Sequence, residues 1–305
     1  MATTFATAHN NLFGAGLDGD VTVTSSSFTL HDPDDPLNPG ANIITTGVLQ
    51  RDLAAGDLTI NTGCVLDTNG YLLQVNGTFT NNGTLSNDGG AASATTGGAA
   101  PGLGSLGLAA AAPNGVTGST GTAPGTWGYG GQGGFGGGLL PSSPAITRQG
   151  SGPSSVPYLL GHLVTTITVG GNPVTFGGFY VGGPGGSGAG DGTNKGGGGG
   201  APGGALAIFA RVFDNTNGTI TCNGGNGGTP TVGNTYGGGG GGGGWILVSW
   251  IHNPNALNLE GIDGTNLASV IGGTASCTGG QAGSGHGTGT GGNPGNDGTV
   301  WAAIS

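Results

Sequence analysis

Glycine is the residue that most restricts what this chain can fold into. It occupies 78 of the 305 positions and forms unbroken runs at 196–200 and 237–244. Such runs are either flexible linkers and loops or ordered, left-handed threefold helices in which the missing Cβ lets neighbouring backbones hydrogen-bond. The ordered form requires dense mutual packing, because fixing a residue costs roughly 1–2 kcal/mol. We favour packed glycine-rich arms. A collagen triple helix is excluded, since no Gly-X-Y register is held.

Charged residues are too few for several common classes of protein. Lys and Arg total 4 and Asp and Glu total 14, which gives a net charge of −10 and only 6% charged residues. In an ordinary enzyme domain about a quarter of the residues are charged, and disordered chains are also kept soluble by charge. Nucleic-acid binding is excluded on the same ground, because it needs clustered basic side chains.

Neither a membrane span nor a secretory signal is expected. No stretch approaches the run of about 18 apolar residues that a membrane span needs. The N-terminal sequence MATTFATAHNNLFGAGLDGD lacks the basic and apolar regions of a signal peptide. We therefore expect synthesis in a cytosol and no membrane insertion. The surface rich in Gly, Thr, Asn and Ser is nevertheless typical of a protein that works outside a cell.

Short apolar segments of period two predict strands along the chain, and helix signals are almost absent. In residues 57–88 the strands LTI, VL, YLLQV, TFT and TLS alternate with Asn-Gly or Thr-Gly corners. Such strands can close hairpins or form successive faces of a solenoid, and the repeated corner chemistry favours the solenoid. We predict an all-β fold, with a short-stranded β-solenoid or stacked-sheet core and long polyglycine-II-like arms.

Composition divides the chain into four parts. Residues 1–56 are predicted to form an N-terminal β or attachment segment, and residues 57–90 a β-repeat block. Residues 91–204 are a Gly-rich region with strands near 162–181. Residues 205–305 are a C-terminal β-repeat block with Gly-rich loops.

A weak internal repeat supports the stacking of similar units. Residues 79–90, FTNNGTLSNDGG, resemble residues 213–225, FDNTNGTITCNGG, with one residue inserted. Residues 275–280, ASCTGG, match the end of the second copy and place Cys277 opposite Cys222. The repeat predicts that these segments lie side by side.

Cysteines and aromatic residues are predicted to have mainly structural roles. An odd number of cysteines without a C-x-x-C pair argues against a disulfide or zinc framework. We expect them to point inward as small apolar residues: Cys64, Cys222 and Cys277. Four aromatic residues flank the glycine runs, either as anchors or as plain core residues: Trp127, Phe135, Trp245 and Trp250. Because Trp245 and Trp250 are five residues apart, they should face opposite sides of one strand.

No pattern in the sequence predicts catalysis. A glycan-cleaving enzyme on such a scaffold needs a pair of carboxylates, whereas most acids lie beside Gly, Pro or Asn and are predicted to be turn residues: Asp18, Asp20, Asp32, Asp34, Asp35, Asp67, Asp88, Asp191, Asp263 and Asp297. Asp214 and Glu260 lie beside strands without a local partner. The segment around Asp32, Asp34 and Asp35 offers oxygen ligands for Ca²⁺, although a Pro/Asp turn explains it better. We predict no enzyme, and no catalytic, cofactor-binding or metal-binding residues.

The block GDLTINTGCVLDTNGYLLQVNGTFTNNGTLSNDGG and the later GGGGGGGGWILV resemble Gly-rich virion proteins of tailed bacteriophages. These include tail-fibre and adhesin-type proteins with β-solenoid or polyglycine-helix parts, and the similarity of pattern covers about residues 57–305. The resemblance implies a non-enzymatic structural protein exposed on the virion: a tail fibre, tail-tip adhesin, capsid decoration or head fibre. It implies synthesis in the host cytoplasm and self-association, with a trimer as the expected form. Other virion proteins are the expected further partners, and a host-surface glycan or protein is a candidate receptor.

Two other functions stay open. One is a bacterial surface or secreted β-solenoid adhesin exported by a non-Sec route, and the other is a glycan-cleaving tailspike. A gene position beside capsid or tail genes would favour the virion protein over the bacterial adhesin. Release of reducing ends from host glycans would favour the tailspike.

Overall fold

The computed structural model describes residues 13–24, 28–31, 42–45, 47–102, 104–106, 111–117, 121, 136–137, 166–169, 172–175, 182–252 and 271–304. Several residues singled out in the sequence lie outside these ranges: Asp32, Asp34, Asp35, Trp127, Phe135, Glu260 and Asp263. The other single residues named above fall inside them.

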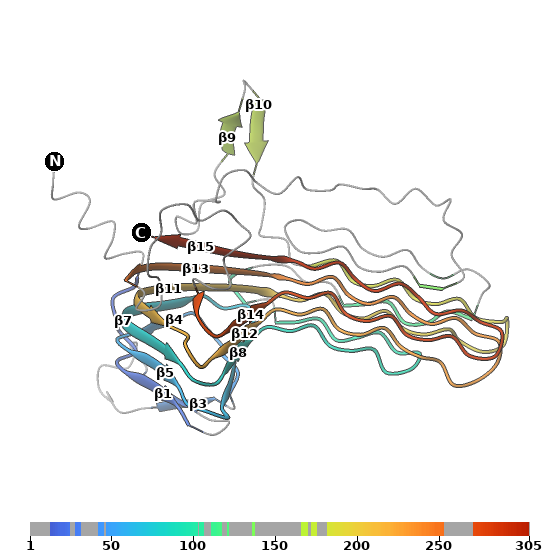
Figure 1. Ribbon diagram of the computed structural model, residues 1–305, viewed down its shortest axis with the longest axis horizontal. Helices are drawn as coiled ribbons and strands as arrows, with labels where there is room; N and C mark the ends of the chain where they lie inside the picture. The colour runs from blue at the N-terminus through green and yellow to red at the C-terminus, as the bar shows by residue number, and fades with distance from the viewer. Residues whose placement is uncertain are drawn as a thin grey trace.

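One seven-stranded sheet, here called the large sheet, forms the base of the molecule (Figure 1). Its strands are β1 (Val21–Val23), β4 (Leu53–Ala55), β5 (Leu58–Ile60), β7 (Leu73–Asn81), β11 (Ala205–Asp214), β13 (Trp245–His252) and β15 (Thr299–Ile304). They run in the order β1-β5-β7-β11-β13-β15, and β4 pairs with another part of β7. Every pairing in this sheet is parallel.

A second, four-stranded sheet, here called the small sheet, is also parallel. It contains β6 (Val65–Asp67), β8 (Thr84–Ser86), β12 (Thr219–Thr221) and β14 (Thr274–Ser276), in the order β14-β12-β8-β6. From β5 onward the chain alternates between the two sheets, so that β7, β11 and β13 are each followed by a strand of the small sheet. Because both sheets are parallel, each turn of the chain adds one strand to each sheet.

The remaining described strands form two antiparallel pairs. One joins β2 (Phe28–His31) to β3 (Asn42–Thr45), and the other joins β9 (Thr166–Val169) to β10 (Asn172–Thr175). The second pair lies within 162–181, where strands were predicted. The described elements are therefore strands, which confirms the all-β prediction. Within the described residues, no helix has the length and apolar character needed to cross a membrane.

The register of the two sheets reproduces the internal repeat. Phe79 of β7 lies opposite Phe213 of β11, and Leu85 of β8 lies opposite Ile220 of β12. Ile220 in turn lies opposite Ala275 of β14, the corresponding residue of the third copy. The residue inserted in the second copy is taken up at the corner that joins the large sheet to the small one. The predicted pairing of the copies is thus confirmed.

Apolar side chains from both sheets form one core between them. The rings of Phe79 and Phe213 stack with centroids 5.3 Å apart, and those of Phe213 and Trp250 with centroids 5.7 Å apart. Trp250 belongs to this core, whereas Trp245 belongs to a smaller cluster with Phe13 that contains the alternate residues of β11 and β13. The two tryptophans therefore face opposite sides of β13, as the spacing predicted.

One predicted corner is wrong. The sequence around Asn76-Gly77 was expected to separate two short strands, but β7 continues through it as a single strand. The amide of Gly77 donates a 2.7 Å hydrogen bond to the carbonyl of Gly56, and a Cβ at position 77 would lie 3.0 Å from that carbonyl oxygen. Glycine is needed here for close approach of the neighbouring chain.

Glycine-rich segments extend away from the two sheets as a bundle of long arms (Figure 1). Segment 236–244 illustrates how they contact one another. The amides of residues 236, 239 and 242 donate hydrogen bonds to carbonyls of segment 182–190. Those of residues 237, 240 and 243 donate to segment 289–298, and those of residues 238, 241 and 244 donate to segment 222–230. The N–O distances are 2.7–3.0 Å. The hydrogen bonds of this segment therefore alternate among three neighbouring segments with a period of three residues.

The contacts between arms leave no room for a side chain at most positions of the glycine run 237–244. A Cβ built on Gly240 would lie less than 3.0 Å from the carbonyl oxygen of Gly280, and one on Gly241 equally close to that of Ala201. Gly291, in the largely exposed segment 289–298, differs: its Cβ would meet no atom closer than 3.0 Å. The run of glycines thus coincides with the segment that has neighbours on every side.

Candidate functional site: the loops at the end of the arms

Three loops connect the arms at the end of the bundle that lies farthest from the sheets (Figure 1). We call residues 191–195, 231–235 and 285–288 the tip loops. Each contains a glycine with positive φ: Gly192 at 92°, Gly233 at 72° and Gly287 at 63°. Because L side chains rarely adopt such values, these glycines allow the chain to reverse within a few residues.

The carboxylate of Asp191 joins the first tip loop to the second. It accepts hydrogen bonds from the backbone amides of Thr193 (3.0 Å) and Asn194 (2.7 Å) in its own loop and from that of Asn234 (2.9 Å) in the next. The side-chain amide of Asn194 adds a further bond of 3.0 Å. These donors, above all the side chain of Asn194, lower the pKa of Asp191 well below its ordinary value.

The second and third tip loops are joined in a similar way. Thr235 and His286 exchange backbone hydrogen bonds of 3.1 and 2.8 Å. Nδ1 of His286 lies 2.7 Å from the carbonyl oxygen of Gly233, and Oδ1 of Asn234 accepts the amide of Thr288 at 3.2 Å. The three loops therefore form one continuous hydrogen-bonded surface.

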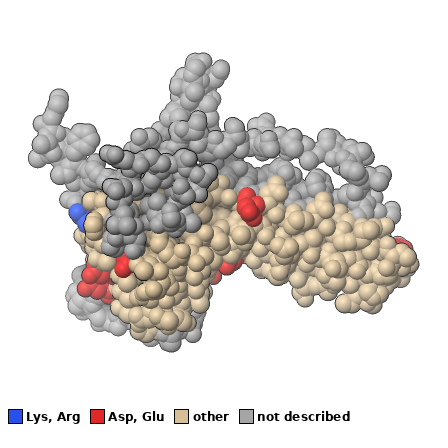
Figure 2. Space-filling model, viewed as in Figure 1, with Lys and Arg blue, Asp and Glu red and all other residues tan. Residues whose placement is uncertain are grey.

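Several side chains of this surface remain exposed. Val232 is 52% exposed, and Thr193, Lys195 and Thr288 are also exposed. Lys195 is the single Lys or Arg between residues 182 and 204, and segments 222–244 and 277–298 contain neither. Figure 2 likewise shows few charged side chains over the arms on the face that it presents. The tip thus differs chemically from the nearly uncharged arms that carry it.

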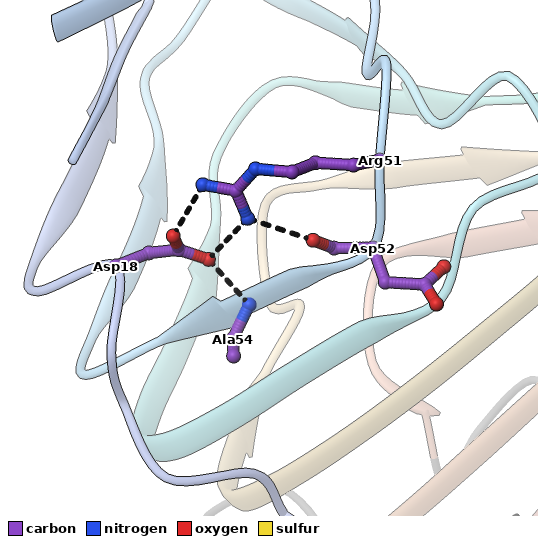
Figure 3. Close-up of polar contacts among 4 residues, drawn as sticks. All are labelled: Asp18, Arg51, Asp52 and Ala54. Carbon is purple, nitrogen blue, oxygen red and sulfur yellow. Dashed lines mark hydrogen bonds and ion pairs between the residues drawn. The ribbon is translucent and has the colours of Figure 1, made fainter. Parts of the chain in front are cut away.

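A second polar cluster lies in the base, and every group in it has a structural partner (Figure 3). The guanidinium of Arg51 contacts both carboxylate oxygens of Asp18, at 2.6 and 3.1 Å, and the carbonyl oxygen of Asp52 at 3.0 Å. Asp18 also accepts the amide of Ala54 at 2.7 Å and is almost completely buried. The cluster holds the segment around Asp18 against β4. Its groups bind one another and are not directed at a ligand.

The other acids mostly bind backbone amides, as turn residues do, but often on a different turn of the chain. Asp20 accepts the amide of Asp57, Asp88 that of Asn223, and Asp297 that of Gly279. Asp67 and Asp214 bind amides two residues further on. The turn interpretation is confirmed for Asp67 and Asp191, whereas Asp18, Asp20, Asp88 and Asp297 also connect distant segments. Asp214, which the sequence placed beside a strand, ends β11 and binds a local amide as a turn residue does. Nothing in the local sequence predicted these partners.

The three cysteines are buried and free, which confirms the prediction that they point into the core. Cys222 and Cys277 directly follow the neighbouring strands β12 and β14 of the small sheet, and Cys64 precedes β6. Among the described residues, no three His, Cys, Asp or Glu side chains are grouped so that they could hold a metal ion.

Comparison with protein-family models, with curated proteins and with solved structures finds no significant match. The interpretation of the tip therefore depends on its geometry and on the sequence pattern.

Proposed function

We propose that the protein is a short-stranded β-solenoid that carries an arm bundle of polyglycine-II-like helices. Two observations support this architecture. The chain alternates between two parallel sheets and adds one strand to each per turn, which is the arrangement of a solenoid. The amides of segment 236–244 donate hydrogen bonds to three neighbouring segments in turn, with a period of three residues. This is the period of polyproline II.

We further propose that the protein is a non-enzymatic structural protein exposed on a phage particle, as a tail fibre, tail-tip adhesin, capsid decoration or head fibre. In this proposal the arms hold the tip loops away from the base as an attachment surface. The supporting observation is the contrast between the buried glycines of segment 236–244 and the exposed side chains of Thr193, Lys195 and Val232. Three linked loops with exposed side chains at the end of a glycine-rich bundle suit recognition better than they suit a plain stalk.

The proposed partners follow from this function. They are a second and third copy of the chain, other virion proteins, and a host-surface glycan or protein that the tip loops contact. The proposed localisation is the virion, after synthesis in the host cytoplasm. Immunogold electron microscopy with antibodies against the purified chain tests this directly: labelled phage particles support it, and label confined to a bacterial surface supports the bacterial adhesin instead.

A pair of exposed valines allows the attachment surface to be tested. Val232 in the second tip loop is 52% exposed and Val65 in β6 is 48% exposed. We expect Val232→Glu to reduce binding of the labelled protein to host cells about tenfold, whereas the control Val65→Glu binds normally. Equal binding by both variants, at unchanged melting temperature, would show that the tip is not the attachment surface.

A further inference from the structure

The small sheet places two thiols side by side where the arms begin. Thr221 and Ser276 are the last paired residues of β12 and β14, and Cys222 and Cys277 follow them directly. The amide of Cys222 donates a 2.9 Å hydrogen bond to the carbonyl of Ser276, so the parallel pairing continues to this point. The two buried thiols are close enough to interact with each other, and the thiol of Cys277 donates a 3.5 Å hydrogen bond to the carbonyl of Thr299. Cys64 is not part of this contact, since it precedes β6 at the other edge of the sheet.

The backbone at both positions is held by the arms. The carbonyl of Cys222 accepts the amide of Gly244, and the carbonyl of Cys277 accepts that of Gly298, each at 2.7 Å. Neighbouring parallel strands are about 4.7–4.9 Å apart, which falls inside the Cα–Cα range of about 4.4–6.8 Å found for disulfides. The expected Cα–Cα separation of the two residues therefore falls within the disulfide range.

We propose that Cys222 and Cys277 are an oxidisable pair that forms a disulfide between two successive turns of the chain. In glutathione buffer one thiolate attacks glutathione disulfide and releases one reduced glutathione. The second cysteine thiolate then attacks the mixed disulfide and releases another. The protein loses two protons and two electrons, and one glutathione disulfide takes them up to become two glutathione molecules.

The bond would join the turn that ends in β12 to the turn that ends in β14, at the origin of arm segments 222–230 and 277–284. It restricts the unfolded chain more than the folded one, so the oxidised protein should melt at a higher temperature, by on the order of 5 °C.

Burial and contact with Cys277 raise the pKa of Cys222 well above its ordinary value. Thiolate is therefore scarce in the folded protein, and the bond should form faster during folding than afterwards.

The test uses the full chain, reduced, unfolded and then refolded in a buffer of reduced and oxidised glutathione. Remaining thiols are blocked with N-ethylmaleimide in denaturant, and peptic peptides are identified by mass spectrometry. We expect a Cys222–Cys277 linked peptide, lighter by two hydrogen atoms than its separate parts, and a fully blocked Cys64. The bond should persist in Cys64→Ser and be absent from Cys277→Ser.

Protein that was never unfolded is oxidised and mapped in parallel, so that a failure to refold does not decide the outcome. The proposal is overturned if Cys222 and Cys277 are recovered as blocked thiols in both preparations. It is equally overturned if they pair with Cys64 or keep glutathione attached. A linked peptide in either preparation, with an unchanged far-UV spectrum and a raised melting temperature, supports it.

Discussion

The side-chain amide of Asn81 donates a 2.7 Å hydrogen bond to the side-chain oxygen of Asn215, 134 residues further along the chain. Asn215 in turn donates to the carbonyl of Gly272 at 2.8 Å, so one buried amide connects three successive turns. Both asparagines lie at the corner between the large and small sheets. The stacking of turns is thus specified by polar side chains as well as by the apolar core.

Asn215→Ala tests this corner. The substitution removes one partner of the buried Asn81 amide and the donor to the partly buried carbonyl of Gly272, which costs about 1–3 kcal/mol. We expect a loss of that size in urea denaturation. Asn217→Ala is the matched control, because Asn217 makes only an exposed 3.3 Å hydrogen bond to Asn82 and should change stability by less than about 0.5 kcal/mol.

Gly240→Val tests the packing of the arms. A side chain at this position meets the backbone of Gly280, and overpacking of this kind costs about 1–3 kcal/mol or blocks folding. Gly291→Ala is the milder control, because its Cβ would meet only one close atom, the carbonyl oxygen of Gly283 at 3.0 Å, in the exposed segment 289–298. Gly240→Val should melt at a clearly lower temperature than Gly291→Ala. A Gly240→Val protein that melts like the wild type would mean that residues 237–244 form a solvated loop.

Asp67→Asn tests the electrostatics of the small sheet. Burial, and secondarily the nearby charge of Asp88, raise the pKa of Asp67. A carboxyl whose pKa is raised on folding contributes stability below its unfolded pKa of about 3.9, and this contribution is lost as the pH rises through the folded pKa. The wild type should therefore lose stability relative to Asp67→Asn between about pH 3 and neutral pH. Parallel stability curves for the two proteins would contradict this.

Asp191→Asn tests the linkage between tip loops. The lowered pKa of Asp191 means that its ionised form stabilises the loops above the ordinary carboxyl pKa and that this effect is lost only as the pH falls through the lowered value. At neutral pH the variant should show faster hydrogen exchange at the amides of Thr193, Asn194 and Asn234. In Asp297→Asn, by contrast, only the region around Gly279 should change.

The base of the protein was largely predictable because its signals are carried by side chains. The alignment of Phe79 with Phe213, including the inserted residue before Gly218, gave the observed register. The five-residue spacing of Trp245 and Trp250 correctly predicted that they face opposite sides of β13. The same reasoning misplaced a corner at Gly77, because an Asn-Gly pair in sequence does not show whether a neighbouring strand approaches closely.

The contacts of the arms and the tip could not be predicted. A glycine carries no side chain that would indicate its neighbours, so the sequence of segment 236–244 did not reveal which segments surround it. The partners of Asp191 and His286 at the tip are in other loops, and Asn234 is 43 residues from Asp191. The Arg51–Asp18 pair was missed for the same reason, since 33 residues separate its members.

Amide hydrogen exchange of residues 237–244 tests the central claim most directly. The account predicts that these amides, which donate to segments 289–298, 222–230 and 182–190, exchange as slowly as those of β11 and β13 in the large sheet. Exchange at the rate of an unstructured glycine peptide would contradict it, because an amide held between packed arms opens only when the bundle does.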